Sequence, residues 1–180
     1  MKQEIIIAGF GGQGVLSLGK ILAYSGLMQG QEVSWLPSYG PEQRGGTANV
    51  TVILSDEKIS SPVLHSYDTV IVLNQPSLDK FESRLKPGGT LIFDSNGFTR
   101  FPQRTDINVY RLDATEYSVA NNMTKTMNML ILGGFLKLCP IVTVENVMKG
   151  LKKSLPERHH HLLGANEQAI NKGMELIVKL

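Results

Sequence analysis

The chain has 180 residues, of which 42% are hydrophobic and 19% are charged, so it can bury one compact core and is neither a disordered nor a collagen-like sequence. Its 18 basic and 16 acidic residues leave a net charge of +2 without a basic tract, which excludes an electrostatic nucleic-acid binding surface. The single cysteine, Cys139, excludes an internal disulfide and a four-cysteine iron–sulfur site.

The sequence predicts that the chain begins with a strand, followed directly by a glycine-rich turn and a helix. We expect a buried strand over 4–8, the turn over 9–14, and a helix over 15–28 whose apolar residues recur at helical spacing. No positively charged leader followed by a long apolar stretch precedes the strand. We therefore expect a cytoplasmic protein.

Two further strands follow. We expect one strand over 32–36 and expect Pro37 to end it. Proline has no backbone N–H to donate to a neighbouring strand. β-branched residues predict the next over 48–54. A turn at 55–58 then leads into a short return through Ile59, which we expect to form an antiparallel pair with that strand.

The second half alternates strands and helices. Near-continuous apolar runs over 68–73 and 90–94 predict central strands covered on both faces, and 107–112 predicts one more strand. A helix over 77–85 is expected to end before the Pro-Gly-Gly at 87–89. Further helices are expected over 114–122, 125–138, 144–155 and 166–178. The sequence therefore predicts an α/β, three-layer, Rossmann-like domain over residues 1–180, with a mostly parallel sheet that has room for one antiparallel pair.

The apolar segment 127–138 is the strongest candidate for a membrane helix. It is interrupted by Gly133-Gly134 and is shorter than the roughly 20 residues that a bilayer requires. We expect no membrane span here. Its methionines and leucines form either a core-facing surface or a partner-binding face, and core packing is favoured.

The glycine turn carries the first candidate binding site. Gly9, Gly11 and Gly14 fit the G-x-G-x-x-G pattern between a strand and a helix, where backbone amides can face an anion. The region after the second strand lacks the carboxylate that a dinucleotide fold places there, which disfavours NAD. The turn either binds an anion through the amides of Gly11, Gly12 and Gln13 or only permits close helix packing, and both interpretations stay open.

The loop over 38–46 carries the second candidate. It follows a strand end, so we expect it beside the glycine turn. Glu42 and Arg44 could make charge-assisted hydrogen bonds and Tyr39 offers a flat face, although an internal Glu42–Arg44 ion pair would explain the same residues. The candidate binding residues are Gly9, Gly11, Gly12, Gln13, Gly14, Ser38, Tyr39, Gly40, Glu42, Arg44 and Gly45.

Two motifs in fixed order, AGFGGQGVLSLGKILAYSG and SYGPEQRGGTANV, resemble the gamma subunit of the 2-oxoacid:ferredoxin oxidoreductases. The resemblance covers most of the chain. It implies a complex that decarboxylates a 2-oxo acid on thiamine diphosphate with magnesium, passes electrons through iron–sulfur clusters, and releases acyl-CoA. It also implies that this subunit helps to form the coenzyme A side of the site. The motifs look more like the 2-oxoglutarate and branched-chain members, although Gln43 stands where methionine is often found.

The chain lacks a catalytic apparatus of its own. No Gly-Asp-Gly accompanies Asn121-Asn122, so this pair is interpreted as a helix end and not as part of a thiamine diphosphate motif. We expect no catalytic residue, no metal site and no cofactor held by this chain alone. The resemblance implies thiamine-diphosphate-binding and ferredoxin-like subunits as partners, and we expect that the isolated chain can form a homodimer.

Two remaining features have ordinary explanations. The run His159-His160-His161 is expected to be solvated or to cap a helix, because adjacent residues point in different directions and metal ligands must converge. Cys139 is expected to be a buried, inert thiol. A free-standing nucleotide- or CoA-binding protein and a scaffold with a vestigial site remain as alternative functions.

Overall fold

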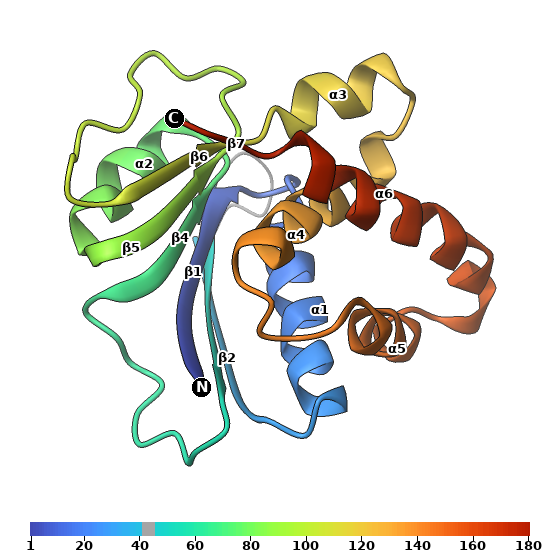
Figure 1. The fold of residues 1–180 in the computed structure, drawn as a ribbon. Helices are drawn as coiled ribbons and strands as arrows, with labels where there is room; N and C mark the ends of the chain where they lie inside the picture. The colour runs from blue at the N-terminus through green and yellow to red at the C-terminus, as the bar shows by residue number, and fades with distance from the viewer. Residues whose placement is uncertain (41–45) are drawn as a thin grey trace.

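A seven-stranded mixed sheet organises residues 1–40 and 46–180, the part of the chain that the computed structural model describes (Figure 1). The strand order is β2-β3-β1-β4-β5-β6-β7. The strands are β1 (Lys2–Phe10), β2 (Glu32–Tyr39), β3 (Thr47–Ser55), β4 (Tyr67–Val72), β5 (Leu85–Phe93), β6 (Asn108–Arg111) and β7 (Val178–Lys179). Strands β1, β4, β5 and β6 are parallel neighbours.

Helices cover both faces of the sheet. Figure 1 shows α2 on one side, with α1, α4, α5 and α6 on the other. The α-helices are α1 (Val15–Met28), α2 (Gln75–Phe81), α3 (Ala114–Ala120), α4 (Met127–Leu138), α5 (Val144–Ser154) and α6 (Leu163–Leu176), and short 3₁₀ turns cover Glu82–Arg84, Thr124–Thr126 and Glu157–Leu162. Each side has its own apolar core, which explains why Ile5, Ile6 and Ile7 are at most 1% exposed. The α/β class, the three layers and the parallel centre are confirmed.

Antiparallel pairing is more extensive than the sequence predicted. Strand β3 lies between β1 and β2 and is antiparallel to both, and β7 is antiparallel to β6. The expected return strand through Ile59 is wrong, since residues 56–66 contain no strand. Both edges of β3 are already occupied by β1 and β2, so a hairpin partner from this segment has no free edge to join.

Strand β2 continues through Pro37 to Tyr39, so the prediction that Pro37 ends it is wrong. The Gly40 amide donates to the Thr47 carbonyl at 3.2 Å, which makes these two residues a hydrogen-bonded pair. Antiparallel pairs alternate, so the Pro37–Val50 pair is a non-hydrogen-bonded one. The Pro37 nitrogen therefore faces the open edge of the sheet, where a missing donor costs no ladder bond.

Two element boundaries also differ from the sequence prediction. Strand β5 begins at Leu85, so the Pro-Gly-Gly at 87–89 lies within the strand, beside a register shift in its pairing with β4. Leu85 is buried against the α2 side of the sheet, which ends the helix earlier than its composition indicates. The last helix ends at Leu176, and Val178 then pairs with Arg111.

Helix α4 belongs to the core. Its residues Met129–Leu136 are buried, and it packs along α6. The core alternative for this segment is confirmed, and the hypothesis of a partner-binding face there is wrong. Within 1–40 and 46–180, no helix combines the length and apolar character needed to cross a bilayer.

Candidate functional site

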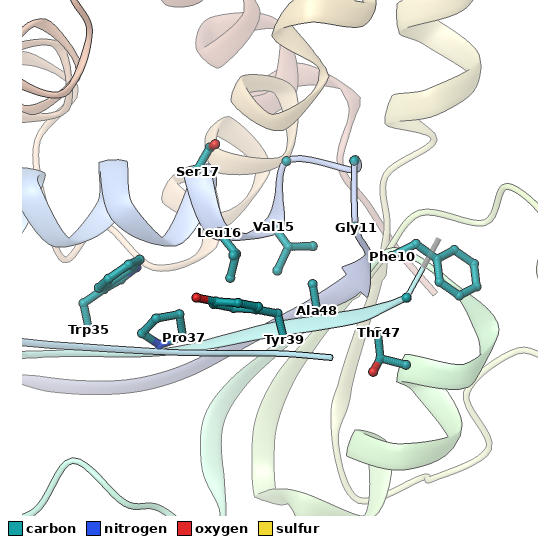
Figure 2. A pocket seen from close by; sticks show the side chains of 13 residues that line it. Phe10, Gly11, Val15, Leu16, Ser17, Trp35, Pro37, Tyr39, Thr47 and Ala48 are labelled. Atoms are coloured by element: carbon teal, nitrogen blue, oxygen red, sulfur yellow. The ribbon is translucent and has the colours of Figure 1, made fainter. Parts of the chain in front are cut away.

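A pocket of about 720 Å³ lies between the end of β2 and the start of α1 (Figure 2). Its lining comes from the glycine turn, the first turn of α1, strand β2 and the first residues of β3. Figure 2 shows the side chains of Val15 and Leu16 pointing from α1 towards Pro37 and Tyr39. This is a concave site of the size that small-molecule ligands occupy.

The strand side of the pocket is formed by three ring-bearing side chains, two of them aromatic, from Trp35, Pro37 and Tyr39. We call this surface the aromatic shelf. Alternate residues of a strand share one face, so continuation of β2 through Pro37 places all three on the side of α1. Trp35 is 40% exposed and Tyr39 is 62% exposed. The shelf therefore offers flat, accessible rings beside the helix.

The opposite side of the pocket is the N-terminus of α1. Gly12 (φ 97°) and Gly14 (φ 77°) adopt left-handed conformations that suit glycine, and they turn the chain from β1 into the helix. No side chain caps Gly14 within the described residues, and Gly12, Gly14 and Val15 all line the pocket. The amides and dipole of this helix end favour a negatively charged group.

The structure narrows the predicted set of anion-binding amides. The Gly11 amide donates to the Gly46 carbonyl at 2.8 Å, and the Gln13 amide donates to the Phe10 carbonyl at 3.1 Å. The expectation that both face a ligand is therefore wrong, because both are used within the protein. The same Gly11–Gly46 bond confirms that the loop after β2 ends beside the glycine turn.

The other predicted residues fall into three groups. Gly11, Gly12, Gly14 and Tyr39 line the pocket. Gly9 and Gln13 lie outside the lining: Gly9 is buried where a β-carbon would lie 2.7 Å from Gln13 Oε1, so glycine there serves close packing. Ser38 and Gly40 also lie outside the lining, and strand alternation directs Ser38 to the face opposite Tyr39. Glu42, Arg44 and Gly45 lie outside the described residues.

Sequence reasoning missed much of the apolar lining. The apolar residues Phe10, Leu16, Trp35 and Pro37 border the pocket but were not predicted, and the polar Thr47 was missed as well. The alternation of large residues at 35, 37 and 39 was a usable signal, and it was lost because the strand was ended at Pro37.

The chemistry of the pocket is that of binding. Among the lining residues that the structure describes, none is an aspartate, glutamate, lysine, arginine or histidine. The site therefore supplies aromatic faces, backbone donors and a partial positive potential from the helix. These groups suit contact with a flat ring and an anion.

Asp94, His160 and His161 make hydrogen bonds within the protein, away from this pocket. Burial raises the pKa of Asp94, whose carboxylate accepts a hydrogen bond from the Thr115 amide at the start of α3 at 2.9 Å. His160 Nε2 donates to the Lys152 and Leu155 carbonyls, while His161 Nδ1 donates to the Arg158 carbonyl. Across residues 1–40 and 46–180, no cluster of three or more acidic, histidine or cysteine side chains is placed to hold a metal ion.

The Asn121-Asn122 pair is a helix end, as predicted. Asn121 caps α3, and Asn122 has a left-handed backbone with φ 55°. The pair therefore stops the helix before the turn that leads to α4.

Comparison with known proteins identifies the family. The model of the pyruvate ferredoxin/flavodoxin oxidoreductase family matches residues 4–176. The 2-oxoglutarate synthase subunit KorC of Methanothermobacter marburgensis is 33% identical over 186 residues, covering 99% of this chain and 98% of the relative. The ketoisovalerate oxidoreductase subunit VorA of the same organism is 38% identical over 135 residues, covering 75% of this chain but only 28% of the relative.

A solved structure agrees with this assignment. The gamma subunit of a keto/oxoacid ferredoxin oxidoreductase from Geobacter sulfurreducens is similar with a TM-score of 0.83 and 28% identity, over 98% of this chain and 96% of that one. The chain belongs to the pyruvate ferredoxin/flavodoxin oxidoreductase family. The family resemblance carried by the glycine turn and the loop after β2 is thereby confirmed.

Proposed function

We propose that this chain is the gamma subunit of a thiamine-diphosphate-dependent 2-oxoacid:ferredoxin oxidoreductase and that its pocket forms part of the coenzyme A side of the site. The observation that carries the proposal is the meeting of the aromatic shelf with the N-terminus of α1. Thiamine diphosphate, magnesium and the iron–sulfur clusters would be held by partner subunits. The complex would work in the cytoplasm.

Coenzyme A has two features that suit this pocket. Its adenine is a flat ring that can stack on Trp35 or Tyr39, and its phosphates are anions that suit a helix N-terminus. Arg44, which lies outside the described residues, would add the full positive charge that the described lining lacks. Glu42 and Gly45 would support this contact from the same loop, whereas Ser38 and Gly40 lie outside the lining.

The substrate that we propose is 2-oxoglutarate. The support is the similarity to KorC along nearly the whole length of both chains. The similarity to VorA makes ketoisovalerate the second candidate. The acid would be recognised largely by the partner subunits, so assays of the assembled complex with both acids decide between them.

The test of the pocket is Tyr39→Ala in the complex assembled with its thiamine-binding and ferredoxin-like subunits. Loss of a stacking surface should raise the KM for coenzyme A about five- to tenfold, with kcat at saturating coenzyme A little changed. Leu36→Ala is the matched control, because Leu36 is 43% exposed on the same strand but points to the opposite face. Equal KM values for the two variants would contradict the proposed pocket.

Arg44→Ala tests whether the positive charge of Arg44 contributes to coenzyme A binding. It should weaken coenzyme A binding by about 1.5 to 3 kcal/mol if one charge-assisted hydrogen bond is lost, without a change in melting temperature. An unchanged coenzyme A dependence with a large fall in melting temperature would show that Arg44 is structural.

Homodimer formation by the isolated chain stays a prediction, to be tested by light scattering.

A further inference from the structure

The Gln13 side chain connects three segments at the carboxyl edge of the sheet. Its Oε1 accepts from the Phe10 amide at 2.6 Å, where β1 ends, and its Nε2 donates to the Leu73 carbonyl at 2.9 Å, where β4 ends. The same Oε1 accepts from Asn74 Nδ2 at 3.4 Å. Asn74 in turn caps α2, since its Oδ1 accepts from the Ser77 amide at 2.9 Å. One side chain therefore ties the glycine turn to β1, to β4 and to the start of α2.

This set of bonds requires a neutral side chain that donates and accepts at once. A glutamine amide does both, whereas a carboxylate only accepts and would face the Leu73 carbonyl with like partial charge. The fit is tight, because a β-carbon on Gly9 would lie 2.7 Å from Gln13 Oε1. The partners of this side chain within the described residues, namely the Phe10 amide, the Leu73 carbonyl and the Asn74 amide, carry no net charge.

Gln13 immediately precedes the helix that borders the pocket. Its own amide donates to the Phe10 carbonyl at 3.1 Å, and the next residue, Gly14, accepts from the Leu18 amide at 2.8 Å to begin α1. Fixing Gln13 therefore fixes the direction of the first-turn amides of α1 and the place of Phe10 at the pocket. We propose that Gln13 is a positioning residue that holds the glycine turn and the N-terminus of α1 in the geometry that receives the anion. The inference rests on the proposed function of the pocket.

Two variants separate the donor from the acceptor. Gln13→Leu removes all three side-chain hydrogen bonds, and Gln13→Glu keeps the acceptor but loses the donor while it is ionised. A protonated glutamic acid donates again, so lowering the pH should restore the bond to the Leu73 carbonyl. Gln75→Glu is the matched control, because Gln75 Oε1 holds a different loop through the Thr99 and Arg100 amides at 3.0 and 2.9 Å.

The first readout is amide hydrogen exchange over residues 9–17 of the full chain. Exchange should become at least about fivefold faster in Gln13→Leu, as expected for the loss of local hydrogen bonds. In Gln13→Glu it should be fast at about pH 8 and slower, relative to wild type, at about pH 5.5. Wild-type protection in Gln13→Leu would overturn the positioning role, whatever the pocket binds.

The second readout is the kinetics of the assembled complex. Gln13→Leu should raise the KM for coenzyme A about five- to tenfold at nearly constant kcat, and the rise in Gln13→Glu should diminish as the pH falls. Gln75→Glu should leave KM unchanged, and an equal rise there would mean general loosening and overturn the proposal. A different outcome is faster exchange in the turn of Gln13→Leu together with an unchanged KM for coenzyme A in the Tyr39→Ala complex. It would mean that the proposed coenzyme A pocket is wrong while the positioning role of Gln13 holds.

Discussion

Gly133 of α4 lies directly against the backbone carbonyl of Ile170 in α6, so closely that a β-carbon at Gly133 would overlap the carbonyl oxygen. The relationship is reciprocal, because a β-carbon on Gly173 of α6 would overlap the carbonyl of Leu130 in α4. The two helices therefore pack backbone against backbone, which explains Gly133 inside an otherwise largely apolar helix. The neighbours are main-chain atoms and cannot rotate away as a flexible side chain would.

Gly133→Ala should therefore destabilise the chain by at least about 2 kcal/mol, despite the better helix propensity of alanine. Gly164→Ala is the control, since Gly164 is an exposed residue of α6 with nothing within 4 Å of its β-carbon position. It should be neutral or stabilising by about 0.5 to 1 kcal/mol. Urea unfolding of both variants measures the difference, and similar stabilities would contradict the close packing.

Glu82 forms hydrogen bonds with residues 100–104, in the segment between β5 and β6. The Glu82 carboxylate accepts from Arg100 Nη1 at 2.9 Å and from the Gln103 and Arg104 amides at 2.6 and 3.1 Å. Burial alone would raise the pKa of Glu82, but these hydrogen bonds outweigh burial and lower the pKa below its usual 4.5. The ionised form is therefore stabilised by folding.

Stability from Glu82 should be present above about pH 4.5 and lost as the pH falls through the lowered pKa. Glu82→Gln should cost about 1 to 3 kcal/mol at pH 7, and the difference from wild type should shrink in acid. Glu145→Gln, which breaks an exposed pair with Lys149, should have little effect at either pH. Thermal melts across the pH range provide the measurement, and a constant deficit at all pH values would count against the argument.

Cys139 should be unreactive in the folded chain. The structure leaves Cys139 only partly buried, not fully buried as the sequence predicted, but this burial still raises the pKa of its thiol to about 11, and only the thiolate is nucleophilic. Alkylation by iodoacetamide at about pH 8 should be roughly a hundredfold slower than for an ordinary thiol of pKa about 8.5, and should become fast in urea. Mass spectrometry of the labelled chain follows this, and rapid stoichiometric labelling of the native form would disprove it.

The isolated chain should have no 2-oxoacid oxidation activity and should bind neither thiamine diphosphate nor iron. Its sequence contains no Gly-Asp-Gly motif and only one cysteine. Purified chain given a 2-oxo acid, thiamine diphosphate and coenzyme A should not reduce viologen, and the partner subunits should restore the reaction. Measurable reduction by the chain alone would refute this expectation.

Local patterns were enough for the elements that depend on short-range physics. The strand, glycine turn and helix over residues 2–28 follow from a buried apolar run, left-handed glycines and helical spacing. The parallel centre follows from apolar runs that need cover on both faces. The family resemblance depends on two motifs and on their order along the sequence.

The candidate site was predicted only in part. The glycine turn and Tyr39 could be found because turns and strand ends carry distinctive residues. Trp35 and Pro37 were missed although they alternate with Tyr39, because a proline in a strand is tolerated only where its nitrogen faces an open edge, and that depends on which strand is the edge.

The sequence by itself determined the class of fold, the presence of the glycine turn between a strand and a helix, and the family, because propensity, periodicity and motif order are properties of neighbouring residues. Only the tertiary structure decided that β3 lies between β1 and β2, that α4 is buried against α6, and that Gln13 is used inside the protein. These outcomes depend on which apolar faces and backbone groups, distant in sequence, satisfy one another at lowest free energy. Such pairings leave no local signal for the sequence to show.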